Sequence, residues 1–166
     1  MSMDILRIQP PRFHVAHQPT KDFHSHGHEW AHLHPHTALR FLQGDKMRTY
    51  ESLFNEFSSA LKFPNYFGRN WPAFGECISD LEWLQGATAY LLMFSNAEAI
   101  YCDEKLPEYP TLLKILAKAG DRWGKPINKQ GPLNRPARPF HCVFQCNGSH
   151  SIEEHLRHSS IDFDEI

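Results

Sequence analysis

The sequence lacks any uninterrupted run of 18 apolar residues, and its N-terminus has neither a charged leader nor an apolar segment behind it. A membrane-spanning helix needs about 20 apolar residues, and a secretory signal needs both missing features. We therefore expect no membrane association and a cytoplasmic location. The 166 residues, of which 41% are hydrophobic, suffice for one core.

Cysteine is also scarce, with four residues and no Cys-x-x-Cys pair. That number is too small for a disulfide scaffold. If Cys142 and Cys146 share a strand, their Cα atoms lie roughly 13 Å apart, beyond the ~7 Å reach of a disulfide. We expect four reduced thiols, with Cys77 and Cys142 in the core, where a free thiol behaves as a small apolar group.

Apart from one H-E-x-x-H run at residues 28–32, the familiar catalytic motifs are missing as well. The sequence has no Gly-rich phosphate loop, no G-x-S-x-G elbow and no cysteine in a recognisable nucleophile setting. We therefore expect a protein that is not an enzyme, with no catalytic residue, no resident metal and no cofactor.

Charge is unevenly distributed around a net value of −2. Residues 45–109 hold five basic and ten acidic side chains, whereas residues 110–147 hold seven basic and one acidic. The acidic segment favours a cationic partner. The basic helix face at Lys114, Lys118 and Arg122 lacks the clustered aromatics of a nucleic-acid platform, so we expect no direct nucleic-acid binding.

Residues 38–146 carry the regular pattern of an α/β domain. Apolar runs of strand length occur at 38–42, 89–94 and 140–146. Between them, apolar residues at helical spacing predict helices that start at Thr49, Asn70 and Pro110. The order strand, helix, helix, strand, helix, strand, with apolar rather than alternating strands, predicts a parallel sheet covered by helices.

The two flanks lack such a pattern. Residues 1–37 are rich in His and Pro and are interpreted as a loosely packed extension, and residues 147–166 as an acidic, frayed tail. Within the extension, residues 28–32 spell H-E-x-x-H, a zinc-protease motif when it lies on a helix. Gly27 and Pro35 bracket the motif, which argues against that helix. Adventitious binding of Zn²⁺, Ni²⁺ or Cu²⁺ by the imidazoles is the preferred alternative.

The run from Phe63 to Leu81 resembles the signature of the barstar family: an aromatic pair, Gly, one residue, Asn, and then a helix that carries acid-Cys-aliphatic. The resemblance covers residues 38–146 and implies the family's three-stranded parallel sheet. It also implies an intracellular inhibitor, without a cofactor, that covers the active site of a barnase-type ribonuclease. Some relatives resemble immunity proteins for other toxins.

Carried over residue by residue, Tyr66, Gly68 and Asn70 match the loop that the family presents to its ribonuclease, and Glu76 matches the helix carboxylate that enters the phosphate site. Asp80 adds to the negative field. A ribonuclease cleft is lined with cationic side chains, so a fixed carboxylate can accept bidentate Arg contacts there as a phosphate surrogate.

Two positions depart from the best-known member. Pro72 replaces a second carboxylate and Gly75 replaces a large aromatic, which weakens the case for barnase itself, while Trp71 and Phe67 are candidates to compensate. A binding or immunity module for another protein therefore stays open. So do structural roles: Asn70 as a helix cap and the Glu76 face as a solvated surface. The predicted partner-binding set is Tyr66, Gly68, Asn70, Trp71, Pro72, Gly75, Glu76 and Asp80.

Overall fold

The computed structural model describes residues 6–131 and 134–166. Its elements, in chain order, are β1 (Phe13–His17), α1 (Thr20–Leu33), β2 (Thr37–Gln43), η1 (Gly44–Lys46), α2 (Tyr50–Leu61), α3 (Trp71–Asp80), β3 (Ala89–Ser95), η2 (Ala97–Ala99), α4 (Tyr109–Trp123), β4 (Phe140–Cys146), α5 (Ser151–His158) and β5 (Phe163–Glu165). No helix among these described residues is long and apolar enough to cross a membrane.

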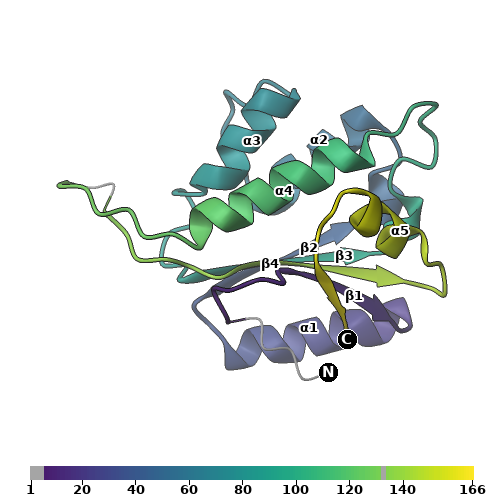
Figure 1. Ribbon diagram of the computed structural model, residues 1–166, viewed down its shortest axis with the longest axis horizontal. Coiled ribbons are helices and arrows are strands. Elements are labelled where there is room, and N and C mark those ends of the chain that lie inside the picture. The colour runs from purple at the N-terminus through teal and green to yellow at the C-terminus, as the bar shows by residue number, and fades with distance from the viewer. Residues whose placement is uncertain (1–5, 132–133) are drawn as a thin grey trace.

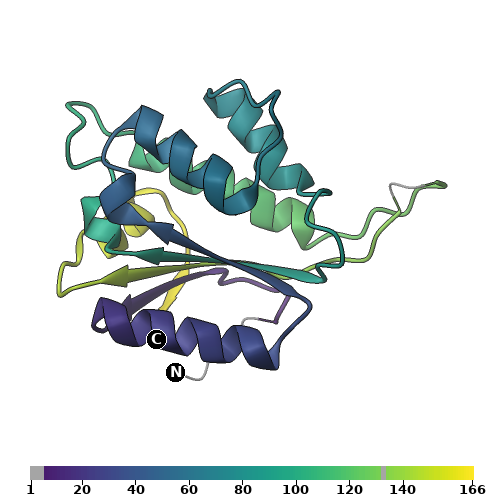
Figure 2. The same cartoon turned by 180° about the vertical axis from the view of Figure 1, so that it is seen from behind.

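The strands form one sheet in the order β2-β3-β4-β1-β5, and every neighbouring pair is parallel. Helices α2, α3, α4 and α5 lie on one face of the sheet, and α1 covers the other (Figures 1 and 2). The chain is therefore an α/β protein of three layers, as expected of parallel strands that are buried on both faces.

The central elements match the sequence-based expectations. The three predicted strands are β2, β3 and β4, and all seven residues of β3 and of β4 are buried. Thr49 caps α2 through a reciprocal pair of hydrogen bonds with Ser52, and Asn70 caps α3. The four cysteines are free thiols, and Cys77 and Cys142 are buried as predicted.

The prediction of a three-stranded sheet is wrong, because the flanks add two strands. Strand β1 pairs with β4 from Phe13 opposite Cys142 to His17 opposite Cys146, and β5 pairs with the other edge of β1. Without β1, the backbone N–H and C=O groups along one edge of the fully buried β4 would be left without partners. The N-terminal segment completes the sheet.

The loose packing expected of residues 1–37 is likewise wrong for their described part. Helix α1 buries Phe23 against a second, smaller core formed by Ala16, Leu91, Met93 and Val143. Gly27, which we expected to oppose a helix, lies inside α1 and is buried. A Cβ atom built there would lie 2.7 Å from the Phe41 ring, so glycine allows the helix to approach the sheet closely.

The frayed tail is also not found. Helix α5 packs against α4 and buries Ile152 and Leu156 completely. Helix α5 then leads into β5, whose pairing with residues 13–15 of β1 places the last residues of the chain at the edge of the sheet (Figure 1).

Two buried histidines join β1 to β4. His141 Nε2 lies 2.8 Å from the carbonyl oxygen of Arg7, and His141 Nδ1 lies 2.9 Å from His14 Nε2. Because a carbonyl only accepts, a neutral His141 donates from Nε2 and accepts at Nδ1, so a neutral His14 donates from Nε2 and carries no proton on Nδ1. That Nδ1 lies 3.6 Å from Asp164 and has no hydrogen-bond partner among the described residues.

We expect Phe23→Ala to lower the free energy of unfolding by about 3–5 kcal/mol, because it removes a fully buried ring. Leu33→Ala on the same helix is the control: Leu33 is 73% exposed, so its change should stay within about 0.5 kcal/mol. Urea denaturation followed by circular dichroism measures both. Equal, small effects would mean that α1 does not pack on the sheet.

Stability should fall on mild acidification through His14. Burial, the neighbouring His141 and the Arg7 guanidinium lower the His14 pKa from 6.5 to about 4, although Asp164 opposes them. The unfolded chain then binds a proton that the folded protein does not, so stability is lost as pH falls from 6.5 toward 4. Relative to His14→Gln, we expect a loss on the order of 3 kcal/mol in urea titrations. Parallel pH profiles would contradict this.

Candidate binding surface on the loop before α3 and on α3

The loop between α2 and α3 exposes one large aromatic side chain. Tyr66 is 77% exposed, which leaves its hydroxyl group in contact with water. Phe67 is half-buried and packs edge-on against Phe54 and Phe63. The loop therefore carries one ring that is packed against the core, Phe67, next to one that is exposed to solvent, Tyr66.

Asn70 fixes the junction between this loop and α3. Its Oδ1 accepts from the Ala73 backbone N–H at 2.9 Å, and its Nδ2 donates to the Gly68 carbonyl at 3.1 Å. A Cβ atom on Gly68 would lie 3.0 Å from that Nδ2, tighter than most such contacts. One end of the Asn70 amide thus caps α3 and the other holds the loop, which is the capping role that the sequence had left open.

Trp71 connects the start of α3 to the start of α4. Its indole N–H donates to Glu108 Oε2 at 2.6 Å, and its ring contacts Phe54 and Phe74 edge-on. Glu108 directly precedes α4, so this bond ties the start of α3 to the start of α4. Sequence reasoning missed Glu108, since 37 residues separate the partners and no local pattern connects them.

The acidic face of α3 lies next to the loop. Tyr66, Phe67, Glu76 and Asp80 line one small hollow. Glu76 is exposed and Asp80 is half-buried, and no hydrogen bond or ion pair from another described residue reaches either carboxylate. Phe74, Cys77 and Ile78 hold the opposite side of α3 in the core. The structure therefore brings Tyr66, Glu76 and Asp80 together on a rigid support.

Pro72 and Gly75 border a second hollow, between α3 and α4. Ile115 lies in its wall, and Lys118 and Arg122 of α4 lie across from Glu76. A Cβ atom on Gly75 would meet only Ile115, at 3.8 Å, so this position leaves open space. The basic side chains of α4, Lys114, Lys118 and Arg122, are exposed. They lie alongside the carboxylates.

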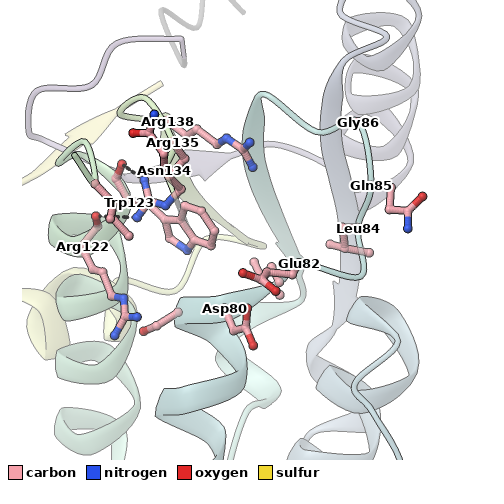
Figure 3. Close-up of a pocket in the computed structure, with 13 residues that line it drawn as sticks. Asp80, Glu82, Leu84, Gln85, Gly86, Arg122, Trp123, Asn134, Arg135 and Arg138 are labelled. Carbon is pink, nitrogen blue, oxygen red and sulfur yellow. Dashed lines mark hydrogen bonds between the residues drawn. The ribbon is translucent and has the colours of Figure 1, made fainter. Parts of the chain in front are cut away.

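A third hollow lies beyond the carboxyl ends of α3 and α4 (Figure 3). Arg122 and Arg138 contribute positive charge there, opposite Asp80. Arg135 stacks over the Trp123 ring at 4.3 Å and donates to backbone carbonyls. Burial and the charge of Arg138 lower the Arg135 pKa. Arg135 therefore holds the segment between α4 and β4 against the end of α4 and is not a free anion ligand.

The predicted H-E-x-x-H motif does lie on a helix, contrary to expectation. His28, Glu29 and His32 are all exposed on α1, and the His28 ring contacts Phe41. Among the described residues, no third ligand converges on this pair of histidines. The arrangement a zinc protease needs is not assembled here.

A family model described as Barstar (barnase inhibitor) matches residues 37–145. The chain belongs to the barstar family. The match includes β2, β3, most of β4 and helices α2 to α4, and thus the whole Tyr66 to Asp80 surface. It leaves out β1, α1, α5 and β5, so the barstar-family region is flanked in sequence by two further helices and by two further strands of its own sheet.

No curated protein matches the chain. Among solved structures, the Aeropyrum pernix ORC2 protein in ADPNP–ADP complexes aligns with a TM-score of 0.54 and 8% identity, over 93% of this chain and 41% of that one. Drosophila ORC bound to AT-rich DNA and Cdc6 aligns with a TM-score of 0.47 and 14% identity, over 93% and 47%. The chain spans less than half of either, and the ORC2 likeness shows a shared fold alone.

Removal of the cap should destabilise α3. We expect Asn70→Ala to cost about 1 kcal/mol of unfolding free energy, because the Ala73 N–H loses its acceptor. Asn70→Asp keeps that acceptor and is the matched control, with a smaller loss. Chemical denaturation measures both. If the alanine variant is as stable as wild type, Asn70 is not a structural cap.

Proposed function

We propose that the protein is a barstar-like inhibitor, not an enzyme, that binds a small basic ribonuclease inside the producing cell and blocks its active site. The membership of residues 37–145 in a family described as barnase inhibitor supports this function. The observation that carries it is the unpaired carboxylate of Glu76, held on a rigid helix beside the exposed Tyr66.

The chemistry of this surface suits a cationic cleft. A carboxylate already positioned on a packed helix loses little conformational freedom on binding and can accept two N–H bonds from one guanidinium. Asp80, one turn further along α3, adds negative charge on the same side. Tyr66 supplies apolar area with a polar tip, which is typical of binding surfaces.

The departures at Pro72 and Gly75 shape the proposed target. Gly75 leaves a hollow with Trp71 and Ile115 in its wall, which fits an apolar side chain from the partner rather than one supplied by this protein. Lys118 and Arg122 border the same hollow, so the partner is expected to bring an acidic group there as well. We therefore expect the target to be a ribonuclease related to barnase whose rim differs from that of barnase.

Glu76→Ala should weaken inhibition of the cognate ribonuclease by tenfold or more, because a hydrogen bond to a charged group contributes about 1.5–3 kcal/mol. RNA-cleavage assays with a panel of small basic ribonucleases measure the inhibition constant. Glu29→Ala is the matched control, since Glu29 is an exposed glutamate on α1, across the sheet. Glu76→Lys should reduce inhibition further, and added salt should reduce the wild-type effect.

A binding module for a different protein is the second candidate, and the altered hollow at Gly75 is the observation that favours it. A partner without nuclease activity, captured by wild type and lost with Glu76→Ala, would support this candidate. Failure of the wild-type protein to slow any ribonuclease of the panel would count against the first.

A further inference from the structure

The sheet has one point where its connections diverge. The chain leaves β1 toward α1 on one face and leaves the neighbouring β4 toward α5 on the other (Figure 1). In open parallel sheets, ligands bind in the crevice outside the carboxyl ends of two such strands. His17, the last residue of β1, lies at this crevice opposite Cys146, the last residue of β4.

Three potential metal ligands meet there. Glu153 Oε1 lies 2.5 Å from His17 Nε2 and 3.0 Å from His150 Nδ1. All three ligand atoms lie within 4.8 Å of one another. His17 comes from β1, whereas His150 precedes α5 and Glu153 lies in its first turn, so the cluster joins two segments that are distant in sequence.

The carboxylate of Glu153 is an unusual group for a protein interior. Glu153 has no exposed surface, and its Oε2 has no hydrogen-bond partner among the described residues. An ionised carboxylate away from water is costly unless a cation compensates it.

We propose that His17, His150 and Glu153 bind a divalent transition-metal ion, with Zn²⁺ as the preferred occupant. Two imidazoles and one carboxylate form a known ligand set for zinc, with water in the fourth position. Tetrahedral zinc with bonds of about 2.1 Å holds its ligands about 3.4 Å apart, so small side-chain rotations suffice here. Mg²⁺ and Ca²⁺ prefer oxygen ligands and fit less well.

The site is open on one side. The His150 side chain is 73% exposed and that of His17 is 28% exposed, whereas that of Glu153 is 1% exposed. An ion can therefore enter from solvent and keep a water ligand on the side of His150, while Glu153 compensates its charge from within. The metal would tie β1 to α5 directly.

Tag-free protein should be titrated with Zn²⁺ in competition with a chromophoric chelator. We expect one tight site per wild-type chain and a drop in affinity on the order of 100-fold or more for His17→Ala, His150→Ala and Glu153→Gln. Because Glu153 is buried, Glu153→Gln is open to folding defects. His150→Ala changes an exposed side chain and keeps the test decisive.

The pair His28→Ala/His32→Ala is the matched control, since it removes the two exposed imidazoles of α1. It should keep the tight site and lose weak, additional binding only. Loss of the tight site in this control, or unchanged affinity in His150→Ala, would overturn the proposal, as would no stoichiometric binding at micromolar Zn²⁺. A zinc-dependent rise in melting temperature, present in wild type and lost in His150→Ala, is the second readout.

Discussion

The parallel pairing of β1 with β4 is the contact on which the rest of the architecture depends. It supplies hydrogen-bond partners for the backbone groups along one edge of the buried strand β4. It also brings His14 against His141 inside the sheet. It also forces the connection after β1 to the opposite face, where α1 covers the second core. The crevice that collects His17, His150 and Glu153 exists only because these two strands are neighbours.

The surface around Glu76 depends on a different set of contacts. Asn70 closes the loop, Trp71 joins α3 to α4 through Glu108, and the aromatic rings beneath them fill the core. These contacts belong to the helical layer and to the barstar-family region. The ribonuclease-binding proposal and the metal proposal therefore rest on separate parts of one molecule, and either can fail without the other.

Sequence reasoning succeeded where the signal is local. Apolar runs marked β2, β3 and β4, and Thr49 and Asn70 marked the starts of two helices. It failed for β1, because His14 and His17 break the apolar run, and the partner that makes His14 acceptable in the core is 127 residues away. The proximity of Lys118 and Arg122 to Glu76 was missed for the same reason, because it depends on how α4 packs beside α3. For the cluster at the crevice, only the His-x-x-Glu spacing at 150–153 was visible.

Because β1 lies between β4 and β5, the limits of the family match differ from the limits of the folded sheet. The family model matches residues 37–145. Strand β1 and helix α1 precede this segment and β5 follows it, yet β1 and β5 belong to the same sheet and α1 covers one of its faces. If the chain were shortened to residues 37–145, it would expose unpaired backbone groups along β4 and the apolar face beneath α1. Such surfaces favour association with other chains. The segment that defines the family is here smaller than the unit that folds.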